Sequence, residues 1–363
     1  MIKYKLGDVV KVISKRVDNP ANCEYDKFVG LEHYVSGEIE IKKYGNTTLL
    51  KSAMKVFKSG DILIARRNVY LKRASIVKFD GITSGDSIVL RVEDKLLRRI
   101  IPFVLNTDEF WGYAEKFSDG TMSKRLSPKV LLEYEFMLPQ IAQQEKLADL
   151  LWAANNTKEA YKKLLYLTDE LVKSQFIEMF GNPNEESKKW GMRPLGELTV
   201  NFNRSRKPVK EGDRKLMQGP YPYYGATGIV DHVNDYRLDG TYLLISEDGK
   251  ALEFRNYDIA FIVSGKIWVN NHAHVLQCKD DLNMVFLQYF IKYLDISHWV
   301  TGIDQKKLNR ENMEAIPIVV PPIVLQNKFG NFIKQTDKSK LNLEQNIVNL
   351  ELTLKALMSK SFG

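Results

Sequence analysis

The sequence has few of the features that mark secreted, membrane-embedded or metal-dependent proteins. Its 363 residues include two cysteines, Cys23 and Cys278, which lie far apart and form no metal-ligand spacing. The longest apolar run, Ala315–Leu325, is too short to span a bilayer and holds three prolines. The first residues contain no apolar core of a signal peptide. These absences predict a cytoplasmic protein with no membrane partner and no bound metal.

Motifs for ATP hydrolysis and methyl transfer are also missing. No Gly-x-x-x-x-Gly-Lys-Ser/Thr loop occurs, and the Asn/Asp-Pro-Pro-aromatic motif of adenine methyltransferases is absent. His272 and His274 lie two apart on an expected strand, but no Cys, Asp or Glu pattern completes a metal site, so we interpret them as structural hydrogen-bonding residues. The net charge of +8 favours a polyanionic partner only mildly. We therefore expect a chain that is not an enzyme.

What the sequence does contain is a long internal repeat. The stretch Pro139–Gly181 recurs 182 residues later as Pro321–Gly363, with no gap in the register. The same register extends back to Gly120, which falls on Gly302. A gapless match of this length indicates two copies of one structural unit.

Each copy of the repeat predicts a long helix. Apolar residues are spaced alternately by three and four, which is the pattern of a coiled coil. A narrow stripe of this length favours packing of the two helices on each other; the alternative is that each helix buries its stripe on its own globular neighbour. The stripe positions are Leu147, Leu151, Ala154, Lys158, Tyr161, Leu165, Thr168, Val172 and Gln175 in the first copy, and Phe329, Ile333, Thr336, Lys340, Leu343, Ile347, Leu350, Leu354 and Leu357 in the second.

Two lysines, Lys158 and Lys340, interrupt the stripe at matching positions. Because a buried ammonium group is costly, the favoured interpretation is that each side chain extends its amine out of the seam into water. The alternative is that they fix the register of the helix pair, as polar seam residues can.

The segments before each helix resemble one another. Val9–Ile13, Ile62–Ala65 and Ser87–Val92 are expected strands of a mixed, mainly β domain, and Tyr242–Ile245 echoes Ile62–Ala65 in the second half. Leu195–Leu198 likewise echoes the stretch that begins at Leu6. The predicted fold class is α+β, with two similar mixed α/β domains joined by two long antiparallel helices in a pseudo-two-fold arrangement. The predicted boundaries are 1–138 for the first domain, 139–181 for its helix, 182–192 for a linker, 193–320 for the second domain and 321–363 for its helix.

Several short sequence motifs are similar to those of a known protein family. They are Tyr221–Ile229, Asp239–Gly249, Asn270–Val275 and the loop Gly302–Leu308 ahead of Ile316–Pro321. Over essentially its whole length, the chain resembles the specificity subunit of type I restriction-modification enzymes.

The resemblance implies two target-recognition domains, each reading half of a split site in double-stranded DNA. It also implies helices that set the spacing between the half-sites and dock two methyltransferase subunits, with restriction subunits as further partners. S-adenosylmethionine, ATP and Mg²⁺ are then expected in those partners, and no cofactor in this chain.

Basic and aromatic residues near strand ends and in loops are the candidate DNA contacts. Arginine can bond guanine through two donors, whereas lysine mostly neutralises phosphate. For each group the alternative is a solvated basic edge or a loop-anchoring core residue. The candidates are Arg66, Arg67, Lys72, Arg73, Lys124 and Arg125 in the first domain, and Arg204, Arg206, Lys207, Tyr221, Tyr223, Tyr224, Gln305, Lys306 and Lys307 in the second.

Two other functions remain open. Asp248 and Lys250 follow an expected strand with Asp239 upstream, a pattern that metal-dependent nucleases use to hold a cation. The long helices would also suit a coiled-coil protein adaptor that does not bind DNA. Such an adaptor would show no salt-dependent DNA affinity, whereas the nuclease would cut DNA alone when given magnesium.

Overall fold

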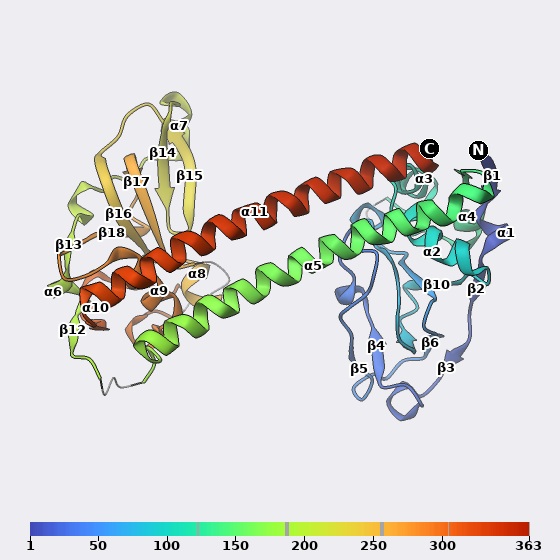
Figure 1. The fold of residues 1–363 in the computed structure, drawn as a ribbon, viewed down its shortest axis with the longest axis horizontal. Coiled ribbons are helices and arrows are strands. Elements are labelled where there is room, and N and C mark those ends of the chain that lie inside the picture. Colours follow the sequence, from blue (N-terminus) through green and yellow to red (C-terminus); the bar gives the residue numbers. More distant parts are fainter. Residues whose placement is uncertain (122, 186–188, 255–257, 304, 363) are drawn as a thin grey trace. The chain divides into compact units, whose positions relative to one another are not determined.

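The computed structural model describes residues 1–121, 123–185, 189–254, 258–303 and 305–362, with the side chains of Lys250 and Phe254 outside the description. The chain forms two compact units (Figure 1). Unit 1 contains residues 1–163 and 343–363, and unit 2 contains residues 164–342. We call the 1–138 part of unit 1 head 1, and the 193–320 part of unit 2 head 2. No helix among the described residues is long and apolar enough to cross a membrane.

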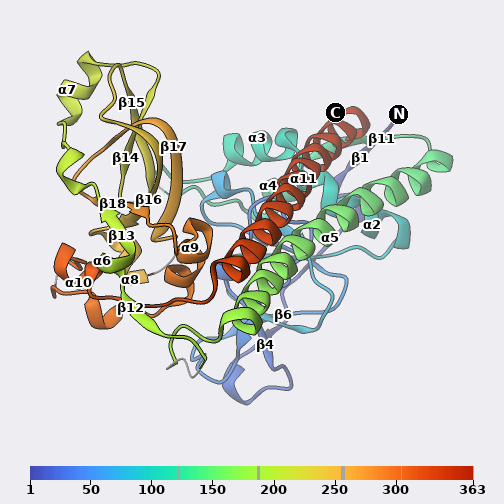
Figure 2. The ribbon, with the colours of Figure 1, turned by 60° about the vertical axis from the view of Figure 1, so that its left-hand side comes forward.

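The two predicted long helices are present as α5 (Ile141–Phe180) and α11 (Ile323–Phe362). In unit 1, Leu151 near the start of α5 shares a core with Leu354 near the end of α11. In unit 2, Phe176 near the end of α5 shares a core with Phe329 near the start of α11. The helices are therefore antiparallel, and both views show them side by side (Figures 1 and 2).

The predicted coiled-coil stripe is confirmed. All of its positions in both helices are buried or half-buried. The C-terminal stop of α5 is also as expected: Gly181 adopts φ +89° and donates its amide to the carbonyl of Ile177 at 2.8 Å. At its ends the stripe packs on the heads as well as on the other helix, because the cores named above include head residues.

Head 1 contains two sheets and a group of helices. The four-stranded sheet has the order β2-β10-β7-β8 and the five-stranded sheet the order β3-β6-β9-β4-β5, while β1 pairs with β11. The strands are β1 (Ile2–Lys5), β2 (Lys11–Ile13), β3 (Arg16–Val17), β4 (Lys27–Val29), β5 (Gly45–Asn46), β6 (Met54–Phe57), β7 (Ile62–Ala65), β8 (Ala74–Ile76), β9 (Gly81–Thr83), β10 (Ser87–Arg91) and β11 (Glu135–Leu138). The helices are α1 (Leu6–Val9), α2 (Lys95–Val104), α3 (Asp108–Phe117) and α4 (Pro128–Leu132), with short 3₁₀ turns η1 (Pro20–Asn22), η2 (Leu31–His33) and η3 (Val69–Leu71).

Head 2 contains one six-stranded sheet of order β13-β18-β16-β17-β14-β15, while β12 pairs with β19. Its strands are β12 (Met192–Pro194), β13 (Thr199–Asn201), β14 (Tyr221–Gly225), β15 (Gly228–Val233), β16 (Leu238–Ser246), β17 (Ala260–Val269), β18 (Ala273–Cys278) and β19 (Pro317–Val319). Its helices are α6 (Leu195–Leu198), α7 (Glu211–Leu216), α8 (Lys250–Phe254), α9 (Met284–Tyr293) and α10 (Arg310–Glu314), with 3₁₀ turns η4 (Asn203–Ser205) and η5 (Ser297–Trp299).

The heads share one scaffold. Sheet β2-β10-β7-β8 matches β13-β18-β16-β17 in order, and the single-turn helices α1 and α6 precede β2 and β13. The sequence-based correspondence between Ile62–Ala65 and Tyr242–Ile245 is off by one residue. Ala65 pairs with Ser87 in head 1, and the structurally equivalent Ser246 pairs with Ala273 in head 2. Ile62–Ala65 therefore corresponds to Leu243–Ser246. The shift changes which residues follow the strand in each head.

Candidate nucleic-acid interface

In head 1, three backbone segments meet where β7 ends. β7 is buried along its whole length and gives way to Arg66 and Arg67, whose charges cannot continue into the core. Because β10 runs antiparallel to β7, the residue before β10, Asp86, lies beside this end, and its carbonyl accepts the amide of Arg66 at 2.9 Å. The third segment arrives from the other side: Leu126 donates its amide to the carbonyl of Arg66 at 2.9 Å, and Arg125 forms an antiparallel bridge with Arg67.

The side chains at this junction form a basic cluster, which we call site 1: Arg66, Arg67, Asp86 and Arg125. Asp86 lies 3.4 Å from Arg67 and 3.7 Å from Arg125. The structure thus brings together three candidates, Arg66 and Arg67 with Arg125, that are far apart in the sequence. Asp86 partly neutralises them and holds the guanidinium groups in place, with Arg125 exposed and Arg67 half-buried.

Two basic residues of the five-stranded sheet lie close to site 1, and sequence reasoning missed both. Lys55 donates to the carbonyl of Ser87 at 2.6 Å, and Arg16 is its strand partner. Burial and the nearby charges of Arg66 and Arg16 lower the pKa of Lys55. Only the pairing of β3 with β6, and the packing of β6 beside β10 of the other sheet, place these cations together, so no local sequence signal reveals them.

The remaining head 1 candidates have internal partners. Lys72 pairs with Asp108 at 2.7 Å, and Arg73 donates to the backbone carbonyls of Leu31 and Arg67. Burial lowers the pKa of Arg73. Lys124 donates to the carbonyl of Glu115 at 2.8 Å. These three residues hold loops of head 1 in place.

Head 2 builds the same junction from different side chains. Glu247 and Asp248 follow β16, and the amide of Glu247 donates to the carbonyl of His272 at 2.8 Å. Leu308 donates its amide to the carbonyl of Glu247 at 2.8 Å, and Lys307 forms an antiparallel bridge with Asp248. We call Glu247, Asp248, His272 and Lys307 site 2.

Site 2 is anchored by buried polar contacts. Arg206 donates to Glu247 at 2.5 Å and to the carbonyl of Ala273 at 2.9 Å, while Lys307 lies 3.3 Å from Glu247. Burial opposes ionisation of Glu247, but the hydrogen bond from Arg206 and the surrounding cations outweigh it and lower the pKa of the carboxyl group. His274 is buried and donates from Nε2 to the carbonyl of Leu308 at 2.8 Å, which supports its structural interpretation.

The loops that carry Arg125 and Lys307 have the same turn. Gly120 adopts φ +96° and Gly302 φ +93°, a region that disfavours other residues. A Cβ at Gly302 would also lie 2.1 Å from the carbonyl oxygen of Gln305. The repeat therefore preserves the turn that presents a cation beside the strand end.

The other head 2 candidates divide by exposure. Arg204, Lys207 and Gln305 are exposed, and Tyr221, Tyr224 and Lys306 are half-buried. Tyr223 is in the core, with its hydroxyl accepting the amide of Val209 at 2.9 Å, so its ring is not offered to a ligand.

The nuclease interpretation does not match the geometry. Asp239 lies near the start of β16 and Asp248 lies just past its end, so the strand separates them by roughly 30 Å at about 3.3 Å per residue. Asp248 is held by His272 at 2.8 Å, and the side chain of Lys250 lies outside the described part of the chain. No group of three or more His, Cys, Asp or Glu side chains among the described residues is placed to hold a metal ion.

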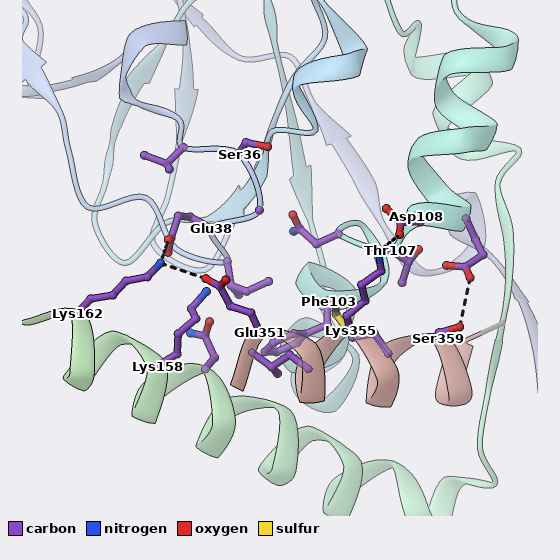
Figure 3. Close-up of a pocket in the computed structure, with 18 residues that line it drawn as sticks. Ser36, Glu38, Phe103, Thr107, Asp108, Lys158, Lys162, Glu351, Lys355 and Ser359 are labelled. Atoms are coloured by element: carbon purple, nitrogen blue, oxygen red, sulfur yellow. Dashed lines mark hydrogen bonds and ion pairs between the residues drawn. The ribbon is translucent and has the colours of Figure 1, made fainter. Parts of the chain in front are cut away.

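A cavity of about 500 Å³ in unit 1 contains the first stripe lysine (Figure 3). Lys158 is buried at 4% exposure, 3.6 Å from Glu159, so the expectation that its amine reaches water was wrong. Burial lowers its pKa. Lys162 pairs with Glu38 at the same wall. In unit 2, by contrast, Lys340 pairs with Asp169 across the helix pair at 2.7 Å, as a register-fixing residue would.

Two related heads, a matched loop junction in each and an antiparallel helix pair define an internally repeated, two-domain α+β protein. The family model for the type I restriction modification DNA specificity domain matches residues 1–165 and 187–352. The chain belongs to that family.

Individual relatives agree with this assignment. The chain is 39% identical over 137 residues to a putative type I restriction enzyme specificity subunit of Haemophilus influenzae, a match that covers 38% of this chain and 34% of the relative. It is 23% identical to the type I restriction enzyme MjaIX specificity subunit of Methanocaldococcus jannaschii, over 99% of this chain and 87% of the relative. The match with the Haemophilus protein thus spans about a third of that protein's length.

Two solved structures share the fold. The type I restriction-modification S subunit from M. genitalium superposes with a TM-score of 0.62 at 17% identity, covering 100% of this chain and 96% of that one. A chain from a study of complex assembly and conformational transition in the type I R-M system superposes with a TM-score of 0.57 at 16% identity, covering 99% and 97%. At these identities the likeness concerns the fold, and it agrees with the fold class predicted from the sequence.

Proposed function

We propose that this chain is the non-catalytic DNA-recognition subunit of a type I restriction-modification complex. Residues 1–138 and 193–320 are its two target-recognition domains, and each reads one half of a bipartite DNA site. Family membership supports the general role. One observation supports the proposal that each domain reads half of the site. Site 1 and site 2 have the same backbone junction on the same scaffold, but they present different side chains.

Electrostatics agree with DNA as the ligand. Site 1 places the guanidinium groups of Arg67 and Arg125 on either side of the Asp86 carboxylate, with further cations, Arg66, Lys55 and Arg16, close by. Clustered cations of this kind bind phosphate and release counterions, and arginine can also bond guanine. The coiled-coil adaptor remains the rival function, and it gives no reason for this cluster.

The exposed apolar faces of the helices support docking of partner subunits. Leu164, Leu167 and Leu171 are exposed on α5 at spacings of three and four, and Val348 and Leu352 are exposed on α11. Exposed leucines at helical spacing mark a protein contact. We assign these faces to two methyltransferase subunits, one per repeat. S-adenosylmethionine would bind in those subunits, and ATP and Mg²⁺ in the restriction subunits.

A domain exchange tests the recognition role. The chain is co-expressed with its methyltransferase subunits, and the methylated motif is read by sequencing of modified DNA. Replacing residues 1–138 with the same domain of a relative should change one half of the motif and leave the other half and the assembly unchanged. A change in both halves would show that the heads do not read independently. Absence of any modified motif in the wild type, with an assembled complex, would favour the adaptor.

An insertion tests whether the helices set the spacing between half-sites. Both helices cross between units at partner positions, after Lys163 in α5 and before Leu343 in α11. One heptad inserted at each point lengthens the pair by roughly 10 Å, or about three base pairs, and turns it by about 20°. The motif should keep both half-sequences and gain a few spacer bases. An unchanged spacer in an active complex would refute the idea.

A further inference from the structure

Sites 1 and 2 are equivalent position by position. The amide of Arg66 bonds the carbonyl of Asp86, and the amide of Glu247 bonds the carbonyl of His272. Their own carbonyls accept from Leu126 and Leu308, which share the repeat register. It follows that Arg67 corresponds to Asp248, and Asp86 to His272.

At these matched positions the acid and the base have exchanged places. In head 1 the second residue after β7 is the cation Arg67, and its carboxylate partner Asp86, 3.4 Å away, directly precedes β10. In head 2 the second residue after β16 is the carboxylate Asp248, and its partner His272, 2.8 Å away, directly precedes β18. One acid–base pair is kept in space although both of its residues have changed.

In both heads the basic side chain of the pair, Arg67 or His272, is more exposed to solvent than its carboxylate partner. The side chain of Arg67 is 43% exposed and that of Asp86 30%. In head 2 the difference is larger, with His272 48% exposed and Asp248 14%. In each head a more buried carboxylate therefore positions a nitrogen-bearing side chain at the surface.

The two outward groups have opposite hydrogen-bonding capacity. A guanidinium group only donates, and it matches the O6 and N7 acceptors of guanine. The carboxylate of Asp248 only accepts a hydrogen bond, so it holds a hydrogen of His272 on Nδ1, and in the neutral tautomer of the ring Nε2 is then the acceptor. Such an acceptor matches an exocyclic amino group, N6 of adenine or N4 of cytosine, and it does not match a phosphate oxygen.

We propose that His272, positioned by Asp248, is a specificity-determining residue of head 2, at the place where head 1 uses Arg67. Site 1 selects a guanine acceptor edge, and site 2 selects an amino-bearing base. This inference rests on the proposed function, and it deepens it by naming how one scaffold reads two different half-sites. The alternative is that the His272–Asp248 pair has a structural role only and stabilises the backbone between the end of β16 and the start of β18.

The test is a base-preference measurement on the assembled complex. The full chain with its methyltransferase subunits is mixed with a randomised duplex library, and bound sequences are counted. His272→Arg should move one base of one half-site from adenine or cytosine to guanine, with a change in preference of roughly tenfold or more. The other half-site should not change. His298→Arg, which adds the same group at another exposed histidine of head 2, is the matched control and should leave the motif unchanged.

A second variant tests the same proposal without the larger side chain that His272→Arg introduces. Asp248→Asn keeps the shape of the positioning residue but introduces an amide group that can donate to Nδ1, which allows the ring hydrogen to move to Nε2. The preference at the same base should then shift from an amino group to an acceptor such as guanine. If both variants keep the wild-type preference, or lower affinity equally for all sequences, His272 does not read a base. A wild-type complex that selects no motif would instead count against the proposed function.

Discussion

Phe176 of α5 is the residue whose removal should most weaken unit 2. It is fully buried, and its ring lies 5.3 Å from Phe329 of α11 and 5.8 Å from Phe286 of α9. Further rings, Phe180 and Tyr293, lie at 5.1 and 5.4 Å. One side chain thus joins both long helices to the helix that covers the sheet of head 2.

The expected cost follows from this burial. Phe→Ala in a packed core lowers the free energy of unfolding by about 3–5 kcal/mol, through lost transfer energy and the cavity left behind. Five flanking aromatic side chains are too rigid to fill that space, so we expect the upper half of this range. Phe176→Leu should cost much less, about 1–1.5 kcal/mol.

Hydrogen exchange measured by mass spectrometry resolves the effect by unit. Peptides from α9 should lose about two orders of magnitude or more of protection in Phe176→Ala, while those from α2 in unit 1 should change little. The repeat supplies a matched control, because Met358 occupies the equivalent position in unit 1 and is only half-buried. Met358→Ala should cost under about 2 kcal/mol and act on α2 instead. A loss below about 1.5 kcal/mol for Phe176→Ala would refute the claim that the aromatic cluster is rigid.

Three further outcomes are expected. A double-mutant cycle on Asp169 and Lys340, measured by urea unfolding, should give a coupling of about 0.3–1 kcal/mol that weakens with salt, and zero coupling would remove the register role. Hydrogen bonds from Lys355 and then Lys72 lower the pKa of Asp108 to about 2 from 3.8, so the stability that its ionised form adds is full well above pH 3.8 and is lost as the pH falls toward 2. Asp108→Asn should therefore lower the unfolding temperature at pH 6, and the difference from the wild type should shrink below pH 4 and nearly vanish only as the pH reaches about 2; a constant difference would contradict this. Arg125→Ala should weaken binding of the complex to all DNA sequences and reduce the slope of log affinity against log salt by about one, and a changed motif would show that Arg125 reads a base instead.

The long helices could be predicted from the sequence because their cause is local. Alternating spacings of three and four specify a helix with one apolar stripe wherever they occur, and every stripe position is indeed buried or half-buried. The environment of Lys158 could not be predicted in this way. Its burial depends on the walls of head 1, which come from two distant parts of the chain, around Glu38 and from Phe103 to Glu109.

Part of each site could also be anticipated. Arg66, Arg67 and Arg125 were candidates because basic residues follow a strand or recur at one place in the repeat, and the structure brings them together. The separation of Asp239 from Asp248 was not anticipated, because the strand between them was expected to be Tyr242–Ile245 and is instead Leu238–Ser246. Because each residue of an extended strand adds about 3.3 Å, the longer strand places Asp239 and Asp248 far apart.

The exchange of acid and base between the heads was out of reach of the sequence for a geometrical reason. The helical repeat has an offset of 182 residues, but the strand ends do not share it: Arg67 and Asp248 are 181 apart, and Asp86 and His272 are 186 apart. Loops of different length between β7 and β10, and between β16 and β18, shift the two halves of the junction by different amounts. The hydrogen bonds between β7 and β10, and between β16 and β18, nevertheless place the equivalent residues side by side in both heads. Paired antiparallel strands keep their ends aligned whatever the length of the loop that joins them. A scaffold of this kind holds the backbone of the junction constant while the side chains on its two strand ends vary independently, which is the property that reading two unlike half-sites requires.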